Sequence, residues 1–170
     1  MDFLQIAKSR YSVRKYKDMP VEKEKLDKIL EAGRVAPTGV NAQPQRIIAV
    51  TSREGLEKLG KGAKTFNAPV VLIVCTDKDS AWVRPADGKN IAEIDASIVT
   101  DHMMLQATEL GLGTVWMCWF KPDVIREEFN IPNSYEIVNL LAVGYADCEP
   151  LSADRHGEMR KRIDETVTYA

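Results

Sequence analysis

The sequence contains few of the residues that commonly perform nucleophilic, acid–base or metal chemistry. It has two histidines, His102 and His156, and three cysteines, Cys75, Cys118 and Cys148. No C-x-x-C pair occurs, and His102 has no potential ligand four residues further on, so we expect no zinc site. Because the cysteines are odd in number and far apart, we expect free thiols in a reducing compartment rather than a disulfide framework.

Several signature motifs of hydrolytic and nucleotide-binding enzymes are also absent. There is no G-x-S-x-G nucleophile elbow, no G-x-x-x-x-G-K-[ST] phosphate loop and no G-x-G-x-x-G after an expected strand. These absences argue against a serine hydrolase, a P-loop NTPase and a Rossmann dinucleotide-binding protein. His102 is expected to be a hydrogen-bonded helix residue rather than a catalyst. If the protein is an enzyme, a bound cofactor is expected to carry its chemistry.

Charge of one sign is not in excess, because 23 basic and 25 acidic residues give a net charge of −2. This balance argues against nucleic acid as the main partner, since such binding depends on excess positive charge. No uncharged apolar run reaches ~18 residues, so we expect no contact with a membrane. The segment Met1–Arg10 carries Asp2 and lacks a long apolar core. We therefore expect no signal peptide and a cytoplasmic protein.

The composition, 45% hydrophobic and 28% charged, is typical of a globular protein and predicts a single domain over residues 1–170. Hydrophobic periodicity predicts helices over 2–9, 54–59 and 91–110, and helices that open at Pro20 and Pro122. Strands are expected over 47–51, 69–76, 114–120 and 137–144. Loops are expected over 36–46 and 77–90, and a mixed tail over 147–170 has strand-like character at 163–169. This order predicts an α+β fold with a central sheet covered by helices.

The expected helix over residues 91–110 is apolar on most of its sides. Its main stripe is Ile94, Ile98, Leu105 and Leu112, widened by Ala92, Ala96, Val99, Met103 and Leu110. A helix that is apolar on most sides must be buried on most sides. One layer of a small domain can hardly provide that burial, so we expect a subunit interface on this helix.

The first candidate site is the basic segment with Arg10, Ser12 and Arg14. Alternate residues of an extended chain point the same way, so these three share one side. Two guanidinium groups and a hydroxyl can hold a phosphate or the polar edge of a ring, because arginine gives bidentate, charge-assisted bonds. The alternative is a solvated basic patch continued by Lys15 and Lys17.

The second candidate site is the loop between Ala36 and Arg46. Thr38, Asn41 and Gln43 offer donors and acceptors between two prolines, and could contact the edge of a heteroaromatic ring. The alternative is an ordinary connection. The loop is longer than the ~4–6 residues usual for connections, which favours a functional role.

Together these segments resemble the nitroreductase family. The resemblance begins with Arg10-x-Ser12-x-Arg14 and Ala36-Pro-Thr-Gly-Val-Asn41-Ala-Gln43-Pro44. It continues through Ala68-Pro69, Asp95-Ala96, the Glu109–Trp116 segment, Phe120-x-Pro122 and the Leu141–Gly144 segment. Each motif is short, but their ordered set covers nearly the whole chain.

The resemblance implies a central mixed sheet and an intertwined homodimer with two FMN molecules at its interface. It implies FMN contacts from Arg10, Tyr11, Ser12, Arg14, Lys64, Gly113, Thr114, Arg160 and Arg162. It also implies FMN contacts from Gly39 and Gln43. Pro37, Thr38 and Asn41 would come from the partner subunit toward the flavin ring, and the tail would reach onto the partner. The arginines and Ser12 would meet the phosphate, ribityl and pyrimidine side, and Lys64 would stabilise negative charge on reduced flavin.

The activity implied by the resemblance is NAD(P)H oxidation, with NADH or NADPH delivering hydride to flavin N5 and then leaving. A nitroaromatic, quinone or similar small-molecule acceptor would then take the electrons in a second step. Three alternatives stay open at this point. They are an FMN-binding carrier or sensor without turnover, a flavin-fragmenting relative and a reductive dehalogenase.

Overall fold

A computed structural model describes residues 2–170. The helices are α1 (Phe3–Ser9), α2 (Lys23–Arg34), α3 (Arg53–Gly60), α4 (Ala92–Glu109), α5 (Pro122–Phe129), α6 (His156–Met159) and α7 (Ile163–Thr166). The strands are β1 (Gln45–Val50), β2 (Val70–Asp77), β3 (Gly113–Met117) and β4 (Tyr135–Gly144). Two 3-10 turns, η1 (Gly39–Asn41) and η2 (Ala153–Arg155), complete the described elements. The expected α+β fold is confirmed.

The sheet has four strands in the order β1-β2-β4-β3, and every neighbouring pair is antiparallel. The expected mixed character is confined to one isolated parallel bridge, in which Ser12 pairs with Thr114 of β3. The segment before α2 pairs with β3 at this single bridge and does not form a fifth strand. The parallel pairing therefore extends no further. As a result β3 is an edge strand whose outer side meets the N-terminal segment.

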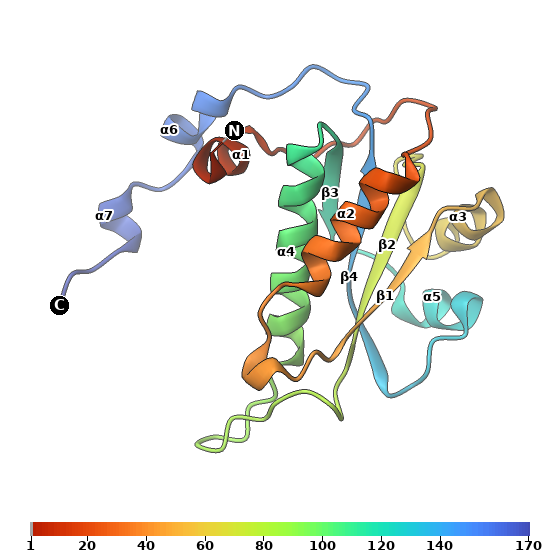
Figure 1. Ribbon diagram of the computed structural model, residues 1–170, viewed down its shortest axis with the longest axis vertical. Helices are drawn as coiled ribbons and strands as arrows, with labels where there is room; N and C mark the ends of the chain where they lie inside the picture. Colours follow the sequence, from red (N-terminus) through yellow and green to blue (C-terminus); the bar gives the residue numbers. More distant parts are fainter. Residues whose placement is uncertain (1) are drawn as a thin grey trace.

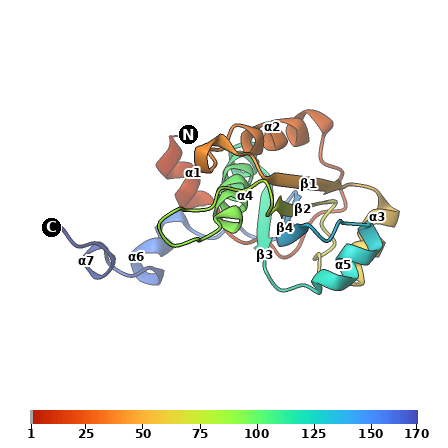
Figure 2. The same cartoon turned by 90° about the horizontal axis from the view of Figure 1, so that it is seen from below.

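Helices cover both faces of the sheet. α2 and α4 lie on one face and α3 and α5 on the other (Figures 1 and 2). Each face has its own apolar cluster, because side chains alternate along each strand. Leu72 and Leu141 pack with Ile29 of α2 and Met103 of α4, whereas Ile73 and its neighbours pack against the α3 and α5 side.

Local sequence explains how α1 and α2 begin. The main-chain N–H of Gln5 donates to Oδ1 of Asp2 at 2.8 Å, and the Asp2 N–H donates to the Gln5 side chain, which together form a capping box. The helix expected to open at Pro20 begins instead at Lys23, because the chain is still extended at Glu22, its N-cap. Pro20 therefore precedes the helix rather than occupying its first turn.

α4 buries one side of its surface and leaves some of its apolar side chains partly open. Ala96 and Val99 are fully buried, as is the larger Met103, which packs against Gly33 of α2, whereas Ile94 is 45% exposed. Ile98 and Leu105, also assigned to the main stripe, are half-buried. The small side chains face the sheet because they allow a close approach of helix and strands. Ile94, Ile98 and Leu105 are therefore left partly open and available to pack against a second surface.

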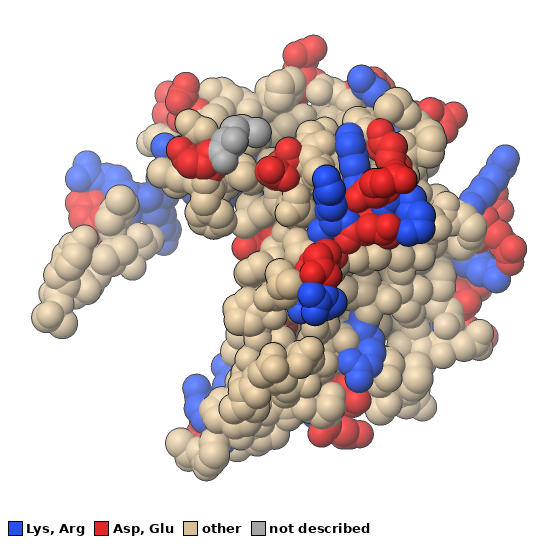
Figure 3. Space-filling model, in the orientation of Figure 1, with Lys and Arg blue, Asp and Glu red and all other residues tan. Residues whose placement is uncertain are grey.

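The last part of the chain differs from its expected conformation. The strand-like residues 163–169 contain the helical turn α7, which is stabilised where the Arg162 N–H donates to the Glu165 side chain at 3.1 Å. No strand lies beside this segment to pair with it, so local capping decides its shape. α6 and α7 extend away from the body and carry basic side chains with them (Figures 1 and 3). Among residues 2–170, no helix is long and apolar enough to cross a membrane.

Candidate functional site

The Arg10–Arg14 segment lies along the outer edge of β3. The Val13 N–H donates to the Thr114 carbonyl oxygen at 2.8 Å, next to the parallel bridge of Ser12 and Thr114. Val13 is fully buried and Tyr11 packs against the same core cluster. Because successive side chains of an extended segment alternate, Arg10, Ser12 and Arg14 project from the other side. This edge position places them in a row beside Gly113 and Thr114.

Arg10 is part of a cluster of guanidinium groups. Nη2 of Arg155 donates to the Arg10 carbonyl oxygen at 2.5 Å, and its Nη1 donates to the Lys8 and Ser152 carbonyl oxygens at 3.0 and 2.7 Å. Burial lowers the pKa of Arg10, as do the positive charges of Arg155 and Arg160, and Asp101 offsets this only in part. Crowded cations of this kind favour a bound anion.

The two tail arginines expected at the site are separated by the structure. Arg160 is close enough to Arg10 to affect its titration. Arg162 instead forms an ion pair with Asp164, with Nε and Oδ1 2.9 Å apart. Sequence reasoning did not select Arg155, which is held at the cluster by backbone carbonyls. The sequence feature that could have indicated it is the presence of Arg155 shortly before the basic run of Arg160, Lys161 and Arg162 in the tail.

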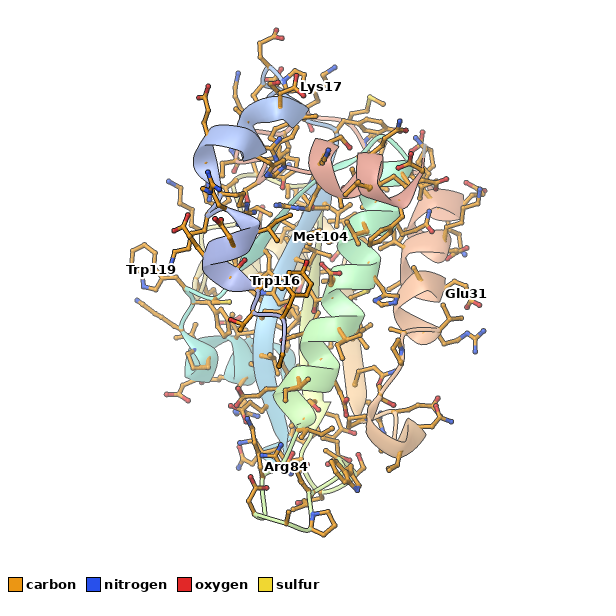
Figure 4. All side chains as sticks on the ribbon, turned by 90° about the vertical axis from the view of Figure 1, so that its left-hand side faces the viewer. Lys17, Glu31, Arg84, Met104, Trp116 and Trp119 are labelled. Atoms are coloured by element: carbon orange, nitrogen blue, oxygen red, sulfur yellow. The ribbon has the colours of Figure 1, made fainter. Side chains whose placement is uncertain are left out.

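A groove runs between β3 and α4 below the cationic cluster. Its volume is about 590 Å³, and it is lined by Glu93, Ile94, Ser97, Ile98, Asp101 and Trp116. The Trp116 indole lies on the α4 side of β3, packed against the same cluster as α4 (Figure 4). Oγ1 of Thr114 is buried and has no hydrogen-bond partner within residues 2–170. The groove therefore offers an aromatic ring and two isoleucines together with the polar Ser97 and the acidic Glu93 and Asp101, and the buried Thr114 hydroxyl lies outside its lining.

Beyond the end of β3, two loops meet beside Lys64. The strand expected over 114–120 ends at Met117, and the chain then turns so that Phe120 forms an isolated bridge with Ala63. Lys64 and Trp119 line one pocket of about 440 Å³. Trp119 is 93% exposed and points away from the body (Figure 4). Sequence reasoning missed Trp119, although an isolated tryptophan after a strand is a usable signal.

The Pro37–Gln43 loop lies in a different part of the fold from the Arg10–Arg14 segment. It sits at the N-terminal end of α4, whereas α1, whose C-cap is Arg10, lies toward the C-terminal end (Figure 1). Within the loop, the Gln43 N–H donates to Oγ1 of Thr38 at 3.1 Å, and the Gly39 N–H donates to Asp95 at 2.9 Å. One chain therefore does not bring Thr38 and Asn41 to the row of Arg10, Ser12 and Arg14.

Residues 2–170 contain no group of three metal-ligating side chains. Nδ1 of His102 lies 2.9 Å from the Ile98 carbonyl oxygen, one turn earlier in α4, as expected for a hydrogen-bonded helix residue. The three cysteines are free thiols, as expected.

Comparison with known proteins places this arrangement in a family. The chain matches the Nitroreductase family model over residues 7–66 and 57–145. It is 35% identical to a Methanothermobacter thermautotrophicus protein named for NADH dehydrogenase and NAD(P)H nitroreductase activity, covering 91% of this chain and 82% of that protein. It is 32% identical to a Bacillus subtilis FMN reductase [NAD(P)H], covering 93% and 69%.

Solved structures agree with this assignment. The chain is 54% identical to a nitroreductase family protein of Clostridium difficile 630, with a TM-score of 0.97 over 99% of this chain and 98% of that one. An FMN-dependent nitroreductase of C. difficile R20291 is 32% identical, with a TM-score of 0.80 over 98% of each chain. With the fold, the cationic row at the sheet edge and these similarities together, the chain belongs to the nitroreductase family.

Proposed function

We propose that the protein is an FMN-dependent oxidoreductase that oxidises NAD(P)H and reduces a nitroaromatic, a quinone or a similar small acceptor. The observation that carries the proposal is the cluster of Arg10, Arg155 and Arg160, with Arg14 four residues after Arg10 and in no ion pair within residues 2–170. Such a cluster matches the doubly charged phosphate of FMN. A relative named FMN reductase and a similar structure named FMN-dependent support the choice of flavin.

The residues present fit this cofactor. The cationic row supplies phosphate ligands at one end, and the groove beside Trp116 is partly apolar and flanked by a β-strand edge. The buried Thr114 hydroxyl, unpartnered among residues 2–170, is available to a polar group of the ligand. Bound FMN would supply the hydride and electron transfer that the side chains cannot. Lys64 would place a positive charge next to the ring.

We propose a homodimer in which the partner subunit completes each site. The loop with Thr38 and Asn41 is bonded to the first turn of α4 through Gly39, whereas α1, which leads into Arg10, lies toward the other end of α4 (Figure 1). A second copy of the chain would bring these residues to the cationic cluster. The apolar side chains left open on α4 and α7, such as Ile94 at 45% and Ile163 at 72% exposed, are suited to an interface. The extended tail has the reach to contact a partner.

The side chains in this proposal bind and position rather than transfer protons. Arg10 and Arg14 fix the phosphate end, the partner's loop fixes the ring, and Trp116 helps to exclude water from the groove. NAD(P)H and the acceptor would occupy the same face in turn, so that one product leaves before the next substrate binds. Free cysteines and the use of NAD(P)H fit a reducing, cytoplasmic setting.

Stopped-flow mixing of the flavin-loaded protein with NADH and with NADPH tests the reductive half. Bleaching of the flavin absorbance with at least one of them is expected. Absence of bleaching with both nucleotides contradicts the proposal. Arg53→Ala, an exposed arginine on α3, serves as a control that should leave the trace unchanged.

Steady-state NAD(P)H oxidation with nitroaromatic and quinone acceptors tests the oxidative half. Turnover with an acceptor supports a reductase, whereas reduction without turnover identifies a carrier or sensor. Product analysis after aerobic photoreduction would reveal flavin fragmentation, and halide release from a halogenated aromatic would reveal a dehalogenase. Flavin fragmentation or halide release would each contradict the proposed reduction of a nitroaromatic or quinone acceptor.

A further inference from the structure

A buried carboxyl group joins the Pro37–Gln43 loop to α4. Asp95 lies in the first turn of α4 and is 1% exposed. Its Oδ1 accepts a hydrogen bond from the Gly39 N–H at 2.9 Å, across a sequence separation of 56 residues. The other side-chain hydrogen bond to the backbone between Thr38 and Asn41 comes from within the loop, where Nε2 of Gln43 donates to the Asn41 carbonyl oxygen at 3.2 Å. Asp95 is therefore the loop's main polar attachment to the rest of the fold.

The loop needs such an attachment because its backbone is strained. Val40, Asn41 and Gln43 have positive φ values of 48°, 58° and 52°. Residues other than glycine adopt this region at a cost, and a β-branched residue such as Val40 does so least readily. Such a conformation persists only where the surroundings hold it in place.

Gly39 makes a second contact that fixes the same point. A Cβ atom at Gly39 would lie 2.4 Å from Cδ1 of Ile91, the N-cap residue of α4. The backbone of the loop therefore rests directly on the start of the helix. The hydrogen bond to Asp95 and the close contact with Ile91 together determine where the following residues, including Asn41, are presented.

The second carboxyl oxygen of Asp95 shows that this is a specialised position. Oδ2 is buried and has no partner within residues 2–170. Burying a polar atom without a hydrogen bond costs free energy, so an apolar residue would be favoured here on packing alone. The side chains next to it in α4, Ala92 and Ala96, are buried and apolar.

We infer that Asp95 is a positioning residue for the flavin ring, acting through the Gly39 N–H on the loop that presents Thr38 and Asn41. The inference rests on the proposed function, because it requires these two residues to contact the ring bound to the partner subunit. Asp95 itself touches the loop and not the cofactor. Its effect is to keep the strained loop in the one conformation that binds the ring.

The test compares four variants of the full-length dimer. Asp95→Ala removes the acceptor, Asp95→Asn keeps an acceptor oxygen of the same shape, and Asn41→Ala removes an assigned ring contact. Glu54→Gln, which neutralises an exposed acid in the first turn of α3, is the matched control. Apo-protein is titrated with FMN and with riboflavin, the visible circular dichroism of the bound flavin is recorded, and kcat and KM are measured.

The expected result is that Asp95→Ala weakens FMN and riboflavin alike, by about ten-fold, since its site of action is the ring side. Its bound-flavin dichroism and kcat should change, and Asp95→Asn should restore most of both. A merely structural role would lower thermal stability without changing the dichroism of the flavin that still binds. Glu54→Gln should match the wild type throughout.

Two results overturn the inference in distinguishable ways. If Asn41→Ala weakens both flavins while Asp95→Ala leaves affinity and dichroism unchanged, the positioning role is wrong and the proposed function stands. If neither substitution affects flavin binding, the ring-side assignment and the proposed function fail together. If Asp95→Ala does not fold, hydrogen exchange of the Gly39 amide in the wild-type apo-protein tests the attachment of the loop instead. A slowly exchanging Gly39 amide supports the attachment, and a fast one contradicts it.

Discussion

Arg14 presents a guanidinium group that forms no ion pair within residues 2–170. Its one recorded contact is from Nη1 to the Ser12 carbonyl oxygen, at 3.4 Å. If it holds the FMN phosphate, Arg14→Ala should weaken FMN binding about ten- to hundred-fold, which corresponds to a charge-assisted bond of ~1.5–3 kcal/mol. Riboflavin, which lacks the phosphate, should bind as before. Titration of the apo-protein with both flavins measures the difference.

Three results of that titration have different meanings. Selective loss of FMN assigns Arg14 to the phosphate, and equal loss of both flavins assigns it to the ribityl chain or ring. No loss of either would return Arg14 to the solvated basic patch that its sequence also allows. Arg53→Ala provides the control for removing an exposed arginine.

The three thiols should differ sharply in reactivity. Burial in β2 raises the pKa of the Cys75 thiol to about 11, whereas Cys118 and Cys148 are exposed. The thiolate is the reactive form, so at pH 8 Cys75 has almost none of it. Iodoacetamide should therefore label Cys118 and Cys148 well before Cys75 in the native protein, as read by peptide mass spectrometry. Labelling in urea should reach all three, and early labelling of native Cys75 would contradict its burial.

At the scale of elements, the packing of α2 on α4 includes one fully buried aliphatic side chain of α2. Ile29 is fully buried among the α4 residues and β2. Ile29→Ala should lower the free energy of unfolding by about 2–5 kcal/mol, because a cavity is added to the lost transfer energy. Urea denaturation at a fixed protein concentration measures this. Lys28→Ala, next to it but exposed, should stay within about 0.5 kcal/mol of the wild type.

α4 illustrates how one helix can serve two surfaces. Its small buried side chains, Ala96 and Val99 among them, set the distance to the sheet, while Ile94 and Ile98 remain partly open beside Trp116. A subunit interface is expected on this helix because it is apolar on most of its sides, and that interface stays a prediction.

At the scale of the whole molecule, the proposed dimer has a direct test. Light scattering at low micromolar concentration should give about twice the chain mass of 19.0 kDa. The physical reason is the set of apolar side chains on α1, α4 and the tail that no element of the same chain covers, such as Phe3 at 70% and Tyr169 at 91% exposed. A stable monomer saturated with FMN would contradict both the dimer and the shared site.

Patterns along the chain were enough to predict most of the helices and strands and the family. Alternation, helical periodicity, caps and prolines are local properties, so they located the α+β elements to within a few residues, except in the tail. The ordered motifs from Arg10 to Gly144 carried the resemblance that the comparisons bear out. These features depend on neighbours along the chain and can be read without coordinates.

Contacts between residues far apart in the sequence could not be predicted and became visible in the folded chain. Arg155 reaches Arg10 across 145 residues and Asp95 reaches Gly39 across 56, and neither pairing has a local signature. The tail also depended on tertiary context, since a strand needs a partner edge and α7 has none beside it. The antiparallel order of the sheet likewise follows from how the connections fold back. Long-range contacts arise from the packing of the whole chain, which a local pattern does not encode.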